Sequence, residues 1–221
     1  MGQIAEQKNN TKSQIYINEN ISYLISKRAI DIIGALLGLI VLSVVFLVVA
    51  IAIKLEDPKG PVFFGQTRVG KNEKDFKMYK FRSMITDAES RLQDLLKHNE
   101  TTGAMFKMKN DPRVTKIGRF IRKTSIDELP QLWNVLKGDM SLVGPRPPLP
   151  REVAEYTTYD KQRLLIQPGC TGLWQVSGRS NIGFREMVHL DIKYAEQRNF
   201  IYDMKIILKT VSLLFGSKNA Y

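Results

Sequence analysis

Two adjacent carboxylates, Asp127 and Glu128, lie in the stretch of sequence that is richest in residues able to do chemistry. This segment, residues 125–147, reads SIDELPQLWNVLKGDMSLVGPRP. Ser125 is a favourable N-cap residue, so the pattern predicts a helix that begins here. Proline fits only the first turn of a helix, so Pro130 places both carboxylates at the helix start, where the helix dipole favours their ionised form. An ionised carboxylate held in this way is a usable nucleophile.

The same residues also fit a purely structural role. Ser125 and Glu128 have the spacing of a capping box, and acidic residues are common in first turns for stability alone. The neighbourhood favours catalysis, because cations of the kind that bind anionic substrates crowd the same stretch. They are Arg119, Arg122, Lys123 and Arg146.

The charge of the whole chain also indicates an anionic partner. Its 221 residues include 33 Lys and Arg against 22 Asp and Glu, which gives a net charge of +11. Such a balance points to nucleic acid, anionic lipid or phosphorylated substrates. The length suits one domain with an appendage. The single cysteine, Cys170, excludes an internal disulfide and suits a reducing compartment.

A long apolar run follows Lys27 and Arg28, and no residue from Ile32 to Ile53 carries a charge. As one helix this run would be roughly 33 Å long, enough to cross a hydrocarbon core of about 30 Å. A cleaved signal peptide is the alternative, but its apolar region spans only about 7–15 residues. We therefore expect a membrane anchor over residues 27–54, preceded by a flexible segment over residues 1–26.

Beyond the anchor, the sequence predicts a domain of mixed α and β structure, mostly helical, over residues 55–221. Strand patterns at 62–64 and 76–82 flank a polar turn and predict a small β-hairpin. Strand alternation places Lys80 and Arg82 on one face, either for phosphate binding or as a solvated basic edge.

Two amphipathic helices are predicted in this domain, over residues 113–123 and 201–215. Both carry basic side chains beside an apolar face. Such helices can lie on an anionic membrane surface, although packing against the core fits the pattern equally well.

The segment 125–147 resembles the signature of the bacterial sugar transferases, the monotopic phosphoglycosyl transferases. Three further blocks match in order: Gln66–Gly70 (QTRVG), Tyr79–Met84 (YKFRSM) and Pro168–Arg179 (PGCTGLWQVSGR). The similarity runs from about Lys27 to the C-terminus. Several long blocks in fixed order are a specific signal, which an Asp-Glu pair alone would not be.

This resemblance implies transfer of a sugar 1-phosphate from a UDP-sugar to polyprenyl (undecaprenyl) phosphate, with release of UMP. The reaction is the first membrane step of exopolysaccharide, capsule or O-antigen-type glycan assembly, here of the hexose-1-phosphate type. By resemblance Asp127 is the nucleophile and forms a phosphosugar–aspartyl intermediate. Glu128 would either help Asp127 to hold Mg²⁺ or assist deprotonation of the lipid phosphate. Mg²⁺ and fixed cations would offset the charge of the diphosphate.

The resemblance further implies that Arg146, held between Pro145 and Pro147, contacts the donor phosphates or the uridine side of the substrate. Further candidates for substrate binding are Lys80, Arg82, Arg122 and Arg179.

The family enters and leaves the bilayer on the cytoplasmic face of the inner membrane through a kinked, re-entrant helix. The kink usually lies at a Ser-Pro pair, and here the matching residues are Ser43 and Val44. We nevertheless expect a re-entrant anchor with a cytoplasmic catalytic domain, because Lys27, Arg28 and Lys54 flank the apolar run at both ends. A straight span is the alternative.

Two other classes of protein compete with this interpretation. A basic nucleic-acid-binding protein is disfavoured, because no helix-turn-helix, zinc or aromatic RNA-binding signature accompanies the charge, so we expect no nucleic acid partner. A non-catalytic membrane scaffold is disfavoured by the intact Asp127, Glu128 and Arg146. A homodimer is compatible with the sequence.

Overall fold

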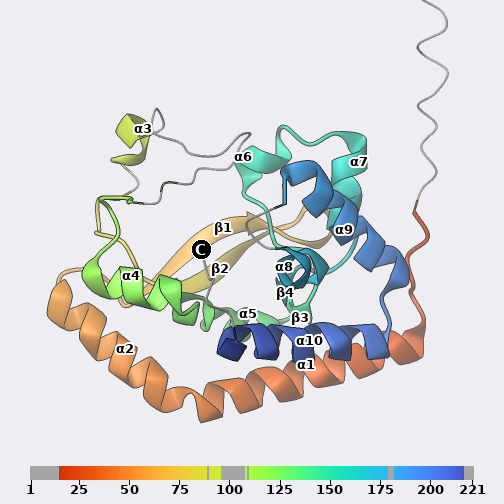
Figure 1. The fold of residues 1–221 in the computed structure, drawn as a ribbon, viewed down its shortest axis with the longest axis horizontal. Coiled ribbons are helices and arrows are strands. Elements are labelled where there is room, and N and C mark those ends of the chain that lie inside the picture. Colours follow the sequence, from red (N-terminus) through yellow and green to blue (C-terminus); the bar gives the residue numbers. More distant parts are fainter. Residues whose placement is uncertain (1–14, 89, 96–107, 109, 179–181, 217–221) are drawn as a thin grey trace, which may run out of the picture.

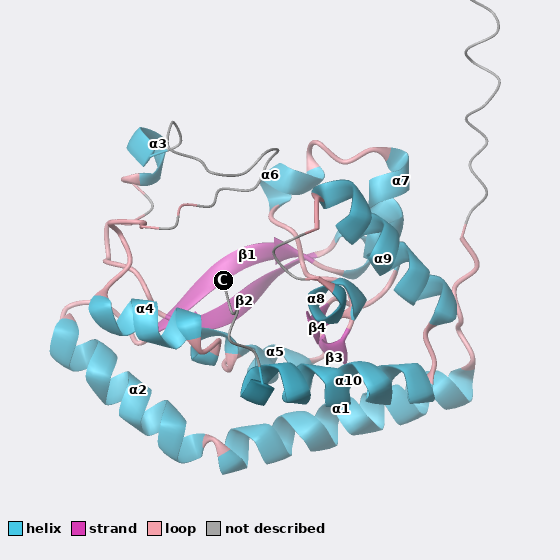
Figure 2. Cartoon of the chain, in the orientation of Figure 1, coloured by secondary structure: helices cyan, strands magenta, loops and turns pink. Residues whose placement is uncertain are grey.

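The computed structural model describes residues 15–88, 90–95, 108, 110–178 and 182–216 (Figure 1). The described chain is mostly helical, with two small pairs of strands (Figure 2). This confirms the predicted α+β class and the β-hairpin. The expected features at residues 1–14 and at Arg179 lie outside the described residues.

The elements follow the chain in this order. The helices are α1 (Ile21–Val41), α2 (Ser43–Glu56), α3 (Leu92–Leu95), α4 (Lys116–Lys123), α5 (Gln131–Lys137), α6 (Pro150–Val153), α7 (Thr158–Lys161), α8 (Leu173–Ser177), α9 (Phe184–Gln197) and α10 (Phe200–Gly216). Short 3₁₀ turns are η1 (Lys71–Glu73), η3 (Ile126–Glu128) and η4 (Gln162–Leu165). Strands β1 (Phe63–Val69) and β2 (Asp75–Phe81) pair antiparallel, whereas β3 (Ser141–Val143) and β4 (Gly169–Thr171) pair parallel.

The apolar run over residues 27–54 forms two helices rather than one straight helix. Helices α1 and α2 meet at Leu42 and are bent by 59° relative to one another. Within the described part of the chain, neither helix alone has the length and composition needed to cross a bilayer, but the bent pair together does. The break lies next to Ser43 and Val44, so it forms without a proline.

The first leg, α1, packs closely on the domain through glycines. A Cβ atom on Gly34 would come within 2.7 Å of Leu142 Cδ1, and one on Gly38 within 2.9 Å of Leu132 Cδ1. Small residues one helical turn apart therefore let α1 approach β3 and α5, which carries Leu132. The same close approach fixes the direction of this leg.

The second leg, α2, packs on a different cluster. Val49 and Ile53 are buried against Phe81 at the end of β2 and against Ile121 of α4. Because each leg follows its own part of the core, the angle between them is set by tertiary packing. A local helix breaker is not required.

Helix α1 begins at Ile21, before the expected boundary at Lys27, because Asn20 caps it. The Asn20 side chain accepts hydrogen bonds from two backbone N–H groups of the first turn, at 2.9 and 3.4 Å. Asn18 in turn exchanges hydrogen bonds with Arg198, each of 2.9 Å, near the start of α10. Residues 15–26 are thus attached to the domain.

Charged side chains on α1 also face the domain. Arg28 donates to the carbonyl oxygens of Val135 and Leu136 at 2.7 and 2.8 Å, which satisfies the C-terminal end of α5. Asp31 accepts a hydrogen bond from Leu142 N at 2.8 Å. One side of α1 is therefore packed against the domain.

Both predicted amphipathic helices are present. Helix α10 covers the expected range 201–215 and contacts α1 (Figure 1). Helix α4 begins at Lys116, later than the expected start at residue 113, because the Thr115 side chain accepts a hydrogen bond from Gly118 N and caps it.

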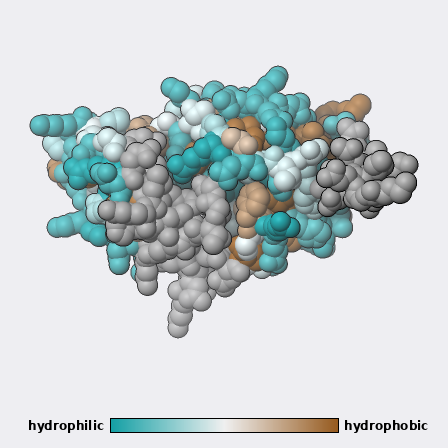
Figure 3. Space-filling view, turned by 90° about the horizontal axis from the view of Figure 1, so that it is seen from above, coloured by the Kyte–Doolittle hydropathy of each residue, from teal (hydrophilic) through white to brown (hydrophobic). Residues whose placement is uncertain are grey.

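Two opposite faces of the molecule differ in polarity. The domain lies on the concave side of the bent pair (Figure 1), and the face turned away from the pair is largely hydrophilic over its described residues (Figure 3). The bent pair instead exposes a run of large apolar side chains. They are Ile33, Leu36, Leu37, Ile40, Val41, Val44, Leu47, Val48 and Ile51.

Candidate active site

Asp127 and Glu128 lie on the 3₁₀ turn η3, directly before α5. Ser125 precedes this turn in the left-handed region, with φ 57° and ψ 15°, and its side chain makes no capping hydrogen bond. The capping box that the spacing of Ser125 and Glu128 allows as an alternative is therefore not formed. A non-glycine residue in this conformation costs about 1–3 kcal/mol, and such strain is concentrated at functional sites. The sharp turn at Ser125 directs the chain from α4 into the carboxylate pair.

Asp127 is buried, with an exposed fraction of 8%. Its pKa is raised to about 6, mainly by burial and further by the charge of Glu128, while Lys80 and Arg122 act in the opposite direction. Most of this carboxyl group is therefore ionised at neutral pH, and it is more basic than an ordinary carboxylate.

Glu128 is ion-paired with Lys80, whose Nζ lies 2.6 Å from Oε1. Partial burial works against ionisation, but the positive charges of Lys80, Arg146 and Arg68 outweigh it and hold the pKa of Glu128 at about 2. The two neighbouring carboxyl groups thus have pKa values that are pushed apart. Such a separation is typical of catalytic pairs whose members have different roles.

A small cleft opens beside Glu128, and the buried Asp127 is not among its lining residues. Its lining residues come from β2, η3, α5, β4, α8 and the loop after β3. They are Met78, Lys80, Glu128, Gln131, Arg146, Pro147, Gly169, Cys170 and Gln175. The structure therefore brings together four residues that the sequence singled out, namely Lys80, Glu128, Arg146 and Pro147.

The loop that presents Arg146 is held by hydrogen bonds from outside it. Prolines lack an N–H group, so this proline-rich loop has few donors of its own. Its successive carbonyl oxygens from Pro145 to Pro148 accept from Gly169 N (2.8 Å), Arg163 Nη2 (3.0 Å), Arg68 Nη1 (3.0 Å) and Val69 N (2.9 Å). The Arg146 side chain is exposed, while Pro145 and Pro147 are buried. An exposed guanidinium thus stands on a fixed backbone.

Two of these donors, Arg68 and Arg163, were not predicted as site residues. Arg68 belongs to the block Gln66–Gly70, so a signal for it was present in the sequence. Arg163 carries no comparable signal. It is buried, and its Nε donates to Asp191 at 2.9 Å, a partner that only the fold supplies.

The remaining predicted site residues lie around the cleft or apart from it. Arg122 is exposed in the last turn of α4, and its charge acts on Asp127. Arg82 is buried and ion-paired with Asp57, and its Nη2 also donates to Asp57 O at 2.8 Å. Arg82 does not line the cleft, so Lys80 and Arg82, predicted to share a face, serve two different carboxylates.

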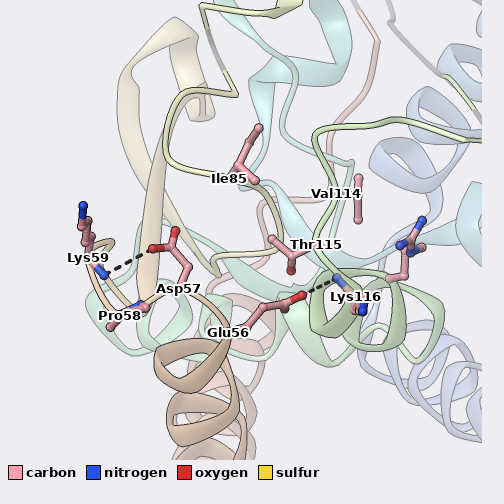
Figure 4. Close-up of a pocket in the computed structure, with 9 residues that line it drawn as sticks. Glu56, Asp57, Pro58, Lys59, Ile85, Val114, Thr115 and Lys116 are labelled. Carbon is pink, nitrogen blue, oxygen red and sulfur yellow. Dashed lines mark hydrogen bonds between the residues drawn. The ribbon is translucent and has the colours of Figure 1, made fainter.

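A larger open pocket, of about 480 Å³, lies where α2 meets α4 and shares no residue with the cleft (Figure 4). Within it the Glu56 carboxylate accepts hydrogen bonds from Lys116 N and Ile117 N at 2.7 and 3.0 Å. Glu56, at the C-terminal end of α2, therefore caps the N-terminus of α4, the helix that precedes η3. This junction positions α4, and we interpret it as structural.

The site also offers ligands for a hard cation. Among the described residues, no group of three or more His, Cys, Asp or Glu side chains is arranged to hold a metal ion. Mg²⁺ commonly keeps several waters and uses only one or two carboxylates together with substrate phosphates. The neighbouring oxygens of Asp127 and Glu128 fit that pattern.

The bent apolar helix pair, the α+β domain and the carboxylate pair beside Lys80 agree with the resemblance found in the sequence. The model of the bacterial sugar transferase family matches residues 22–217, and the chain belongs to this family. The resemblance found in the sequence is thereby confirmed.

Three relatives illustrate the range of this similarity. The chain is 53% identical over 194 residues to the galactosyl transferase CpsE of Streptococcus agalactiae, which covers 87% of this chain and 43% of that protein. It is 43% identical over 199 residues to the undecaprenyl-phosphate galactose phosphotransferase of Salmonella typhimurium, and this match covers 88% of this chain and 41% of that protein. It is 40% identical over 201 residues to the exopolysaccharide production protein ExoY of Sinorhizobium fredii, and this match covers 89% of this chain and 88% of that protein. The chain thus spans less than half the length of the first two relatives and most of the third.

Proposed function

We propose that this chain is an enzyme that transfers a sugar 1-phosphate from a UDP-sugar to undecaprenyl phosphate, with release of UMP. The observation that carries this proposal is the adjacent pair Asp127 and Glu128, with opposite pKa shifts, beside Lys80 and Arg146. The names of relatives support the lipid acceptor, the phosphotransfer and a place in exopolysaccharide production. A galactose or glucose donor agrees with those names.

In the first step an Asp127 oxygen forms a bond to the sugar-bearing phosphorus of the UDP-sugar. The bridging P–O bond breaks, and UMP leaves with its electron pair. In the second step an oxygen of undecaprenyl phosphate attacks the same phosphorus, and the bond to Asp127 breaks. Covalent catalysis of this kind lets a soluble donor and a lipid acceptor use one site in turn.

The other residues act on charge and orientation. Glu128 remains ionised and, together with Asp127, would hold Mg²⁺. When bound, the ion supplies positive charge that offsets the negative charge of the diphosphate. Lys80 and the Arg146 fork provide fixed cations at the cleft.

The bent pair α1 and α2 supplies the membrane contact. Figure 1 shows that both helices rise from their junction towards the domain, so both outer ends lie on the domain side. Helix α10, which contacts α1, also exposes Ile201, Leu208 and Val211. We infer a re-entrant anchor in the inner membrane, with the cleft on the cytoplasmic side, where the soluble donor is available.

The experiment that tests this function is trapping of the covalent intermediate. Full-length protein with Mg²⁺ and UDP-galactose or UDP-glucose, radiolabelled in the sugar and without lipid acceptor, should release UMP and retain label on Asp127. Asp127→Asn should lose both labelling and turnover. Asp87→Asn is the control, because Asp87 is exposed and remote from the cleft. Intersecting double-reciprocal plots with no trapped label would instead indicate a ternary complex.

A further inference from the structure

Arg68 lies on β1 behind the loop that carries Arg146, and its exposed fraction is only 5%. Its Nη1 donates to Pro147 O at 3.0 Å. Its Nε and Nη2 both donate to Gln66 Oε1, at 3.1 and 2.7 Å. All of these acceptors are neutral, and no carboxylate among the described residues forms an ion pair with Arg68.

Three of the four other buried arginines in the described chain are neutralised by an aspartate. Arg82 pairs with Asp57, Arg113 with Asp111 and Arg163 with Asp191. Arg198 has no such partner in the described residues, but its guanidinium lies 5.7 Å from the centre of the Tyr23 ring, whose face attracts a cation. Arg68 is therefore a buried charge beside the cleft, and only neutral groups accept its hydrogen bonds.

The setting of Arg68 is unfavourable for a positive charge. Burial, together with the like charge of Arg146, lowers the pKa of Arg68 to about 10, although Glu152 and Glu128 act in the opposite direction. Arg68 is still charged at neutral pH. A neutral donor would hold the Pro147 carbonyl equally well, so the hydrogen bond does not account for a buried cation.

We propose that Arg68 is a positioning residue of the donor site, and that its unneutralised charge behind Arg146 preforms the positive field that receives the diphosphate of the UDP-sugar. Arg68 acts through the loop and through its field, because it does not line the cleft itself. A field that is already in place requires no reorganisation when the anionic donor binds. This role rests on the proposed function, and it deepens the account of the same site.

The neighbouring glutamine offers a direct test. Gln66→Glu would place a carboxylate where the amide oxygen now accepts from Arg68, so the charge would be neutralised while the hydrogen bonds remain. We expect the KM for UDP-galactose to rise about tenfold or more, with an unchanged KM for undecaprenyl phosphate and an unchanged or higher Tm. Gln197→Glu adds the same charge at an exposed position of α9 and should leave both KM values as they are.

The outcomes separate the field from a purely structural clamp. A wild-type KM for UDP-galactose in Gln66→Glu would overturn the proposal. The hydrogen bonds of Arg68 would then be sufficient for donor binding without its unneutralised charge. If Gln66→Glu lowers Tm, Arg68→Met and Arg68→Lys decide between the two. We expect Arg68→Met to raise the donor KM without lowering Tm and Arg68→Lys to restore part of the donor affinity. Equal KM values for UDP-galactose in Arg68→Met and Arg68→Lys would show that the charge at this position does not contribute to donor binding. Absence of UMP release by the wild-type protein with either donor would reject the proposed function instead.

Discussion

Lys27 Nζ on α1 lies 2.9 Å from Asp203 Oδ2 on α10, and the exposed fractions of the two side chains are only 10% and 7%. The same ammonium group donates to Val143 O at 2.9 Å, directly before the loop that carries Arg146. A charge at the start of the bent pair thus joins the anchor, the last helix and the cleft loop. The sequence shows Lys27 only as a flank of the apolar run, and the structure directs its side chain into the domain.

This buried ion pair predicts a strong effect on stability. Lys27→Met leaves Asp203 buried without its cation, so the free energy of unfolding should fall by about 3–5 kcal/mol. The double variant Lys27→Met/Asp203→Asn should lose less than the sum of the two single variants. Chemical unfolding in detergent micelles measures this double-mutant cycle. Additive losses would show that the two charges are not coupled.

The raised pKa of Asp127 predicts an acidic limb in the rate of UMP release. The proposed nucleophile must be ionised, so the rate should fall as the pH falls through the pKa of Asp127, which is about 6 in the metal-free protein and lower when Mg²⁺ is bound. Lys80→Met removes a charge that lowers this pKa, so the limb should move to higher pH. Lys116→Met, an exposed change away from the cleft, should leave the limb in place. A limb that does not move in Lys80→Met would assign it to another group.

The contact between β3 and β4 predicts a second structural effect on the site. A Cβ atom on Gly169 would lie 2.0 Å from Gly144 N, and this backbone atom cannot move aside cheaply. Gly169→Ala should therefore lower the free energy of unfolding by about 1–3 kcal/mol and displace the Arg146 loop. Activity at a temperature where the variant remains folded should be strongly reduced. Gly183→Ala is the matched control, because a Cβ atom there meets nothing within 4 Å.

The proposed re-entrant anchor predicts that both ends of the bent pair are on the same side of the membrane. Single cysteines at Glu19 and Lys59, both exposed, can be introduced in a Cys170→Ser background. An impermeant thiol reagent should label neither position in intact cells and both after the cells are opened. Labelling of Glu19→Cys alone from outside would establish a straight span.

The sequence by itself determined the elements whose signals are local. The uncharged run from Ile32 to Ile53 predicts an apolar anchor, and the strand patterns around Gly70 predict the hairpin. The ordered blocks around Asp127 and Arg146 identify the family, because the spacing of chemically specific residues is preserved along the chain. These features depend on neighbours in sequence, so they can be recognised without the fold.

Only the tertiary structure decided how distant residues meet. The bend at Leu42 has no proline, and it arises because α1 and α2 pack on separate clusters of the core. Residues of opposite charge far apart in the chain, such as Lys80 and Glu128, are paired by the approach of η3 to β2. Periodicity reports the face on which a side chain lies but not its partner, so the burial of Arg68 beside neutral acceptors was invisible in the sequence. The energy of a buried charge depends on its whole surroundings, and the fold alone supplies them.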